Sequence, residues 1–221
     1  GVISSEEIRI WARINKGENL LGLDLQRVKR DLEMVPLIES AAIDRVLPDA
    51  LRLRIKERRP IAKVVIYNQR PEGELVRREF WLDASTVVMF PIDARSVVRP
   101  PSAKWMPLII GVNQAELFPG RAVQSPQLKS ALSLIDRFDL SPMAGLVHLR
   151  EIKVTRRETI EVVTWQGGRI TLALNGLDRQ LRRWRQIHDL GRKYQRAIMS
   201  VDLSIKNNLP VQWGLLVKAD S

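Results

Sequence analysis

The chain contains no cysteine and only two histidines in 221 residues, and these shortages exclude several kinds of chemistry. Without cysteine there is no disulfide, no thiolate metal site and no cysteine nucleophile. His148 and His188 lie far apart in the sequence, so a zinc or iron centre has no ligand set. His148 falls in an apolar, strand-like segment and His188 among arginines, so structural or surface positions explain both better than catalysis.

Other signatures of enzymes and membrane segments are also missing. Gly167-Gly168 lies between two predicted strands and not before a helix, so no phosphate-binding loop is present, and there is no nucleophile elbow. Glu6 and Glu7 fall at a predicted helix start, where carboxylates act as capping groups. No apolar run approaches the roughly 18 residues of a membrane-spanning helix. The sequence therefore predicts no enzymatic activity, no cofactor and no metal.

Positive charge is what the chain has in excess, and it is unevenly placed. There are 36 lysines and arginines against 25 aspartates and glutamates, a formal net charge of +11. Residues 1–58 are close to balance, so nearly all of the excess lies after them. It is densest between Arg179 and Arg196, a cluster that could meet phosphate, anionic lipid or an acidic protein.

Two helices are predicted near the start of the chain. Ser4 and Glu7 have the spacing of a capping box, which predicts a helix that continues to about Asn15. Asp24 is the expected N-cap of a second helix, whose apolar residues recur at helical spacing until Pro36.

Two strands are expected to follow these helices, at 38–46 and 50–57. In the second strand, leucine and isoleucine alternate with arginine and lysine, so one face is apolar and the other cationic. Because two helices need a sheet of more than two strands, a further strand is expected upstream of Gly1. The residues Arg58-Arg59-Pro60 mark the expected boundary of this domain.

The rest of the chain is predicted to be mostly strands, with two helices. Ser125 and Pro126 mark the start of the first helix, and an apolar stripe that includes Trp184 defines the second, over 177–194. The chain is expected to end in a hairpin that turns at Asn207-Asn208. Further strands are predicted at 61–67, 79–82, 86–90, 146–155, 159–165 and 169–174, an exposed loop at 95–104, and the two hairpin strands at 198–206 and 209–217.

Several motifs together resemble the FtsQ/DivIB family of cell-division proteins. The segment from Pro36 to Ala62, with its Leu47-Pro48-Asp49 turn, is similar to the end of that family's POTRA domain. Further similar segments follow in the family's order and cover essentially the whole chain. They are Phe80–Val87, Met106–Gly111, Val201–Leu203 and Val211-x-Trp213.

The resemblance implies an α+β fold in two domains. Residues 1–58 would be a POTRA domain lacking its first strand, with two helices on a small sheet. Residues 59–221 would be a larger mixed β-sheet domain with two covering helices. The family is bitopic in the inner membrane, so a transmembrane helix is expected upstream, with this part in the periplasm and enriched at the division septum.

The resemblance also implies a function. The family has no enzymatic activity and links components of the divisome. The end of its second domain pairs with FtsB/DivIC-like and FtsL-like partners, and its POTRA domain is associated with recruitment through other division proteins.

The closing hairpin is therefore the predicted partner-binding site, with 205–215 as the strand-addition region. A terminal strand can leave backbone groups unpaired, and an added partner strand gains main-chain hydrogen bonds there. Where the family has Arg-Tyr this chain has Ser204-Ile205, and Pro210 would cost the partner one bond if its nitrogen faced outward. The candidate residues are Ile205, Asn208, Leu209, Val211 and Trp213, with Arg179, Arg183 and Arg192 as auxiliary charges that steer an acidic partner.

Two other functions stay open at this stage. A POTRA adaptor for outer-membrane assembly or secretion would need tandem POTRA units or a long series of alternating strands. A nucleic-acid-binding protein would use the arginine-rich helix, but Trp184 shares the apolar stripe, which favours core packing over base stacking. An ordinary solvated helix face also accounts for the arginines.

Overall fold

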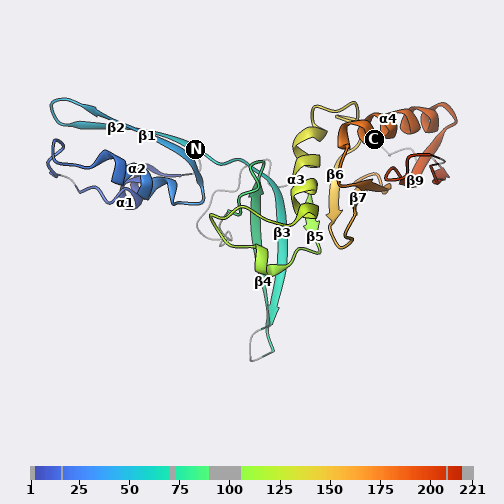
Figure 1. Ribbon diagram of the computed structural model, residues 1–221, viewed down its shortest axis with the longest axis horizontal. Helices are drawn as coiled ribbons and strands as arrows, with labels where there is room; N and C mark the ends of the chain where they lie inside the picture. Colours follow the sequence, from blue (N-terminus) through green and yellow to red (C-terminus); the bar gives the residue numbers. More distant parts are fainter. Residues whose placement is uncertain (1–2, 16, 70–72, 90–105, 208, 216–221) are drawn as a thin grey trace.

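The computed structural model describes residues 3–15, 17–69, 73–89, 106–207 and 209–215 and has the predicted α+β fold (Figure 1). The molecule is elongated, with the first helices and strands at one end of its long axis and α4 and β9 at the other. The N-terminal elements are α1 (Ser5–Trp11), α2 (Leu25–Glu33), β1 (Ile38–Val46) and β2 (Ala50–Glu57). The later elements are β3 (Pro60–Gln69), β4 (Leu75–Asp83), β5 (Leu108–Ile110), the short 3-10 helix η2 (Gln114–Glu116), α3 (Pro126–Phe138), β6 (Leu149–Lys153), β7 (Thr159–Thr164), β8 (Arg169–Ala173), α4 (Leu177–Lys193), β9 (Arg196–Asp202) and β10 (Val211–Leu215).

Side-chain caps fix the starts of the first two helices where the sequence predicts them. Ser4 and Glu7 form the reciprocal capping box of α1, and the Asp24 carboxylate accepts from the amides of Gln26 and Arg27 at the start of α2. The hydrogen bond from the Arg27 amide to Asp24 is the largest cause that lowers the pKa of this carboxyl group below its ordinary value. The helix α1 ends at Trp11, earlier than the predicted Asn15.

The N-terminal part has its own small core between α2 and the sheet of β1 and β2. Val28 and Leu32 of α2 are fully buried against Ile38 and Ala41 of β1. The strands β1 and β2 are antiparallel and are the two strands that this sheet has among the described residues. This arrangement of two helices on a small sheet is the one that the resemblance implies for the first domain.

The larger sheet has eight strands in the described part of the chain, in the order β10-β9-β8-β7-β6-β5-β3-β4. It is mixed, because β5 runs parallel to both β3 and β6, and β8 runs parallel to β9. One row of directly paired apolar residues crosses all the strands. In order from β4 to β10 the row consists of Phe80, Val64, Ile109, Ile152, Val162, Ile170, Val201 and Val211.

Two helices cover the face of the sheet from which this apolar row projects. The helix α3 packs against β3 and β7, and α4 packs against β8 and β9. The helices meet through Phe138 and Trp184, whose ring centroids are 5.8 Å apart. Trp184 is 1% exposed, so the part of the stripe that carries it is core, as the sequence predicts, whereas Tyr194 at the predicted end of the helix is 62% exposed.

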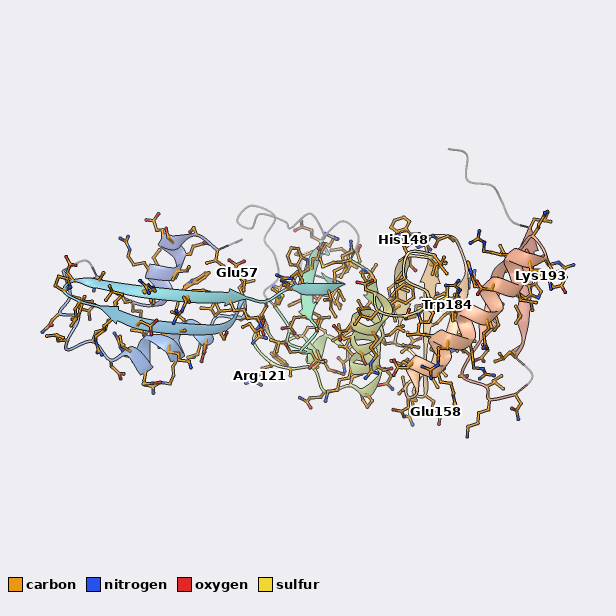
Figure 2. The ribbon with its side chains drawn as sticks, turned by 90° about the horizontal axis from the view of Figure 1, so that it is seen from above. Glu57, Arg121, His148, Glu158, Trp184 and Lys193 are labelled. Atoms are coloured by element: carbon orange, nitrogen blue, oxygen red, sulfur yellow. The ribbon has the colours of Figure 1, made fainter. Side chains whose placement is uncertain are left out.

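The two parts of the molecule contact one another at the turn between α2 and β1 and at the start of β3. Leu37 packs against a small buried cluster that includes Trp81 and Met89. Arg58, which follows β2, forms an ion pair of 2.8 Å with Asp83 at the end of β4, and both side chains are largely buried. In Figure 2, Glu57 marks this junction, and Lys193 lies at the far end of the molecule. The boundary between domains at residues 58 and 59 stays a prediction.

Further sequence expectations differ from the structure or fall outside it. The segment predicted as a strand at 86–90 makes only isolated bridges at Val87 and Val88 in its described residues, because the Asp83 side chain accepts from the amide of Val87 in a turn. In the closing hairpin, β9 spans 196–202 where 198–206 was predicted, and β10 begins at Val211 where a start at 209 was predicted. The expected loop at 95–104 lies outside the described residues.

No helix within the described ranges is both long and apolar enough to cross a membrane.

Candidate partner-binding site

The strand β10 is the last strand of the large sheet on its C-terminal side. It pairs antiparallel with β9, and no other described strand lies beyond it. Val211 and Trp213 are on this strand, Leu209 lies just before it, and Ile205 lies in the connection from β9. Asn208 lies outside the described residues. Val211 and Trp213 thus lie on one sheet edge, and Ile205 and Leu209 lie in the segment that leads to it.

The backbone of Val211 faces away from the sheet. The amide of Asp202 donates to the carbonyl of Pro210 at 3.4 Å, whereas the next amide, that of Leu203, donates to Thr171 on the other neighbour of β9. Hydrogen-bonded and non-hydrogen-bonded pairs alternate along an antiparallel pair of strands. Val211, which lies opposite Val201, is therefore in a non-hydrogen-bonded pair, and its N–H and C=O point outward.

The same geometry shows which way the nitrogen of Pro210 points. The N–H and C=O positions of a residue in a strand point to the same side. The carbonyl of Pro210 is directed at β9, and its nitrogen is therefore directed there too. The missing donor thus costs the sheet one internal bond and leaves the outer edge unaffected.

The side chains of this region are directed mainly at the protein's own core. Leu209 and Val211 are half-buried and pack against the main hydrophobic core, and Trp213 lies against Gly191 of α4. Ile205 is 42% exposed. A hollow of about 410 Å³ lies beside Trp213, lined by Leu190, Gly191, Tyr194 and Arg196. The edge therefore offers backbone groups next to a mostly apolar hollow with an arginine at its rim.

The three predicted auxiliary arginines have different surroundings. The guanidinium of Arg183 donates to the carbonyls of Ile205 and Lys206 and so binds the connection between β9 and β10. Arg179 is exposed, and neither it nor Arg192 makes a side-chain hydrogen bond or ion pair with the residues that the structure describes. Of the three arginines, Arg179 and Arg192 are therefore the two whose guanidinium groups could contact a partner.

The two histidines have different neighbours. His148 has Gln166 at 3.5 Å from its Nδ1, and His188 lies 3.7 Å from a carboxylate oxygen of Asp189. Burial is the main cause that lowers the pKa of His188, although Asp189 acts in the opposite direction. Among the residues with described positions, no group of three or more histidines, aspartates or glutamates could hold a metal ion.

Sequence reasoning missed three residues that shape this site. Arg183 looks like any other arginine of the cationic face, and the carbonyls that it binds are more than 20 residues away. Gln180 has the helical spacing of the apolar stripe, three residues after Leu177 and four before Trp184, but its side chain is polar, and it is buried and bonded to the end of β8. Nothing in the local sequence indicated a role for Gly191, because Trp213, which packs against it, lies more distantly in the chain, beyond β9.

Comparison with known proteins places this geometry in a family. Residues 1–58 match the family model of the POTRA domain, FtsQ-type. The chain is 31% identical to cell division protein FtsQ of Syntrophotalea carbinolica over 168 residues, which is 75% of this chain and 53% of that protein. It is 26% identical to cell division protein FtsQ of Geobacter sp. (strain M21) over 211 residues, covering 95% of this chain and 71% of the relative.

A third relative, cell division protein FtsQ of Anaeromyxobacter sp. (strain K), is 25% identical over 82% of this chain and 56% of its own length. The chain thus spans between about half and seven-tenths of the length of these relatives. The motifs, the fold with its small N-terminal and large mixed sheet, and these matches agree: the chain belongs to the FtsQ family of cell division proteins.

Proposed function

We propose that this chain is the extracytoplasmic part of a non-enzymatic divisome scaffold that binds an FtsB-type partner, together with FtsL, by strand addition to β10. The N-terminal POTRA domain would contribute to recruitment through other division proteins. A membrane anchor upstream would hold the protein in the inner membrane at the septum.

The observation that carries this proposal is the outward backbone of Val211 at the edge of the sheet. Free N–H and C=O groups on an edge strand are a template for another strand. Val201 on β9 pairs with Val211, which fixes its register, so an added strand would continue the sheet beyond β10. The exposed backbone thus offers a partner main-chain hydrogen bonds without rearrangement of the core.

The surroundings of β10 suit an amphipathic, acidic partner segment. The hollow between Trp213 and the end of α4 could take an apolar side chain of the added strand. Arg179 and Arg192 would attract acidic residues and speed the encounter. Pockets that receive alternate side chains give specificity to strand addition, whereas the main-chain bonds give affinity.

The comparisons favour division over the two alternatives. The N-terminal match is to the FtsQ-type POTRA domain, and the relatives with matching sequence are cell division proteins, not components of outer-membrane transport. The burial of Trp184 removes the aromatic side chain that base stacking on the arginine-rich helix would have used.

A pair of substitutions at Val211 tests strand addition. Val211→Pro removes the outward N–H, whereas Val211→Ala removes much of the same side chain and keeps the donor. Since one hydrogen bond contributes about 0.5–1.5 kcal/mol, and proline also obstructs a strand laid against the edge, we expect the proline variant to bind at least about tenfold more weakly than the alanine variant. The measurement is titration calorimetry with the extracytoplasmic segment of the organism's FtsB-type protein.

Folding is the control in this comparison. Both variants should unfold at similar temperatures, because the nitrogen of Val211 makes no bond to β9. If the two folded variants bind the partner with equal affinity, the outward edge of β10 is not the binding site.

A further inference from the structure

The helix α4 holds the C-terminal hairpin at two separate places, and the first is the connection between β9 and β10. Nη1 of Arg183 donates to the carbonyl of Ile205 at 2.9 Å, and Nη2 donates to the carbonyl of Lys206 at 2.7 Å. A guanidinium presents several N–H groups in a fixed fork, so it can bind two successive carbonyls together. A lysine ammonium is a single flexible point of attachment and cannot reproduce this arrangement.

The second place is Gly191, in the last turns of α4. A Cβ added to this residue would lie 2.6 Å from Cζ3 of Trp213 and 2.7 Å from the carbonyl oxygen of Arg196. Both distances are too short for a real carbon atom, so only glycine lets the indole lie directly on the helix. Alanine is the better helix former at an interior position, which means that the helix itself gains nothing from this glycine. The close approach of the Trp213 indole on β10 and of the Arg196 carbonyl at the start of β9 is what requires it.

One contact holds the connection that leads into β10, and the other lies in the middle of this edge strand. An edge strand has hydrogen bonds on one side only, so fewer interactions fix its position than in a central strand. The two contacts from α4 help to fix the position of β10, which lacks a second neighbouring strand. A strand that is already held in its bound conformation saves its partner the free energy of ordering it.

We infer that α4 positions β10 for strand addition, with Arg183 and Gly191 as positioning residues. Arg183 therefore acts through the two carbonyls that it binds and does not act as a steering charge. The role in partner binding rests on the function proposed above. The positioning itself does not, because it is a property of the unbound protein.

Hydrogen exchange of the unbound chain tests the positioning. Arg183→Ala should raise the exchange rates of the protected amides in Val211–Leu215 by at least about fivefold, since two charge-assisted hydrogen bonds are lost. Arg179→Ala is the matched control, because it removes an equal charge from the same helix at a residue with no such bond. Its rates should stay within about twofold of those of the unchanged protein.

Arg183→Lys separates charge from geometry. It keeps the positive charge but loses the fork, so exchange in β10 should remain close to that of the alanine variant. Wild-type protection in either the lysine or the alanine variant would overturn the positioning role of Arg183.

Gly191→Ala tests the second contact. Exchange in β10 should rise about fivefold or more, although helix propensity alone would favour the alanine. Gly22→Ala is the control, because its added Cβ would lie at an ordinary distance of 3.8 Å from the nearest atoms, those of Asn19. Unchanged exchange in the folded Gly191→Ala protein would overturn the positioning role of Gly191.

Binding kinetics with the FtsB-type segment then connect positioning to function. Arg183→Ala should raise the dissociation rate about fivefold and leave the salt dependence of association unchanged, whereas Arg179→Ala should mainly slow association at low salt. Equal losses in association rate for both variants would show that Arg183 is a steering charge. If the unchanged protein fails to bind the segment, the proposed function fails, and the exchange experiment still decides whether α4 positions β10.

Discussion

At the scale of single residues, His188 gives the molecule a dependence on pH. Its side chain is 20% exposed, and burial together with Arg192 and Arg185 lowers its pKa below the ordinary value of 6.5, against the opposing effect of Asp189. His188 lines a second cavity, separate from the hollow beside Trp213, and Arg196 of β9 lines it too and adds a further positive charge nearby. The imidazole is therefore neutral in the folded protein at neutral pH.

The sign of the effect follows from the protons bound in each state. Between the lowered pKa of folded His188 and its ordinary value of 6.5, the unfolded chain binds more protons than the folded one. Stability then rises with pH across this window, and it falls as the pH drops below about 6.5. The penalty is complete once the pH is below the folded pKa.

We expect His188→Gln to reduce this loss of stability. Between pH 7 and pH 5 the free energy of unfolding should fall less in the variant than in the unchanged protein, as measured by urea denaturation at each pH. Gln186→Leu, at an exposed residue of the same helix that does not titrate, is the control and should leave the slope unaltered. Identical slopes for the unchanged protein and the His188 variant would mean that burial of this imidazole does not control the pH dependence.

At the scale of elements, Gln180 joins α4 to the end of β8. The Nε2 group of its side chain donates to the backbone carbonyls of Ala173 and Asn175, and its Oε1 accepts from the backbone amide of Ala173. The residue is 2% exposed. A buried backbone group that loses its partner costs about 1–3 kcal/mol. Gln180→Leu should therefore lower the free energy of unfolding by about 2–3 kcal/mol, measured by urea denaturation.

Gln186 provides a matched control on the same helix. It is exposed, so Gln186→Leu should change stability by no more than about 0.5 kcal/mol. A loss for Gln180→Leu as small as that of the control would show that its three hydrogen bonds contribute little to holding α4 on the sheet.

At the scale of the whole molecule, the contact between the N-terminal part and the large sheet depends on Asp83. Its carboxylate is 5% exposed and binds the guanidinium of Arg58, the hydroxyl of Ser85 and the amide of Val87. Removing one partner of a buried ion pair leaves the other charge without compensation and costs about 3–5 kcal/mol. Asp83→Asn should thus destabilise the protein by about 3 kcal/mol.

The substitution should also loosen the connection between the two parts. Trypsin should cleave the Arg58-Arg59 segment faster in Asp83→Asn under native conditions. Asp178→Asn is the control, because it removes an equal charge from an ion pair of 2.7 Å whose side chains are 52% and 57% exposed. Exposed pairs contribute about 0–1 kcal/mol, so the control should behave like the unchanged protein. Cleavage at equal rates in both variants would contradict a role for Asp83 at this junction.

The sequence by itself determined the features that depend on neighbouring residues. Capping by Ser4 and Asp24, the helix that starts at Pro126 and the alternating residues of β2 are local, and all are found where they were predicted. The apolar stripe of α4 also identified Trp184 as a core residue. The family resemblance needed only motifs in the right order along the chain.

The tertiary structure alone decided the features that join distant segments. The three residues of β5 are too few to show a period, yet this strand lies between β3 and β6 and completes the apolar row. Strand order is set by hydrogen bonds between strands, and these leave no trace in local sequence. The terminal strand was predicted as a sheet edge, but for the same reason only the structure shows that Val211 faces outward on it and that Arg183 binds backbone carbonyls.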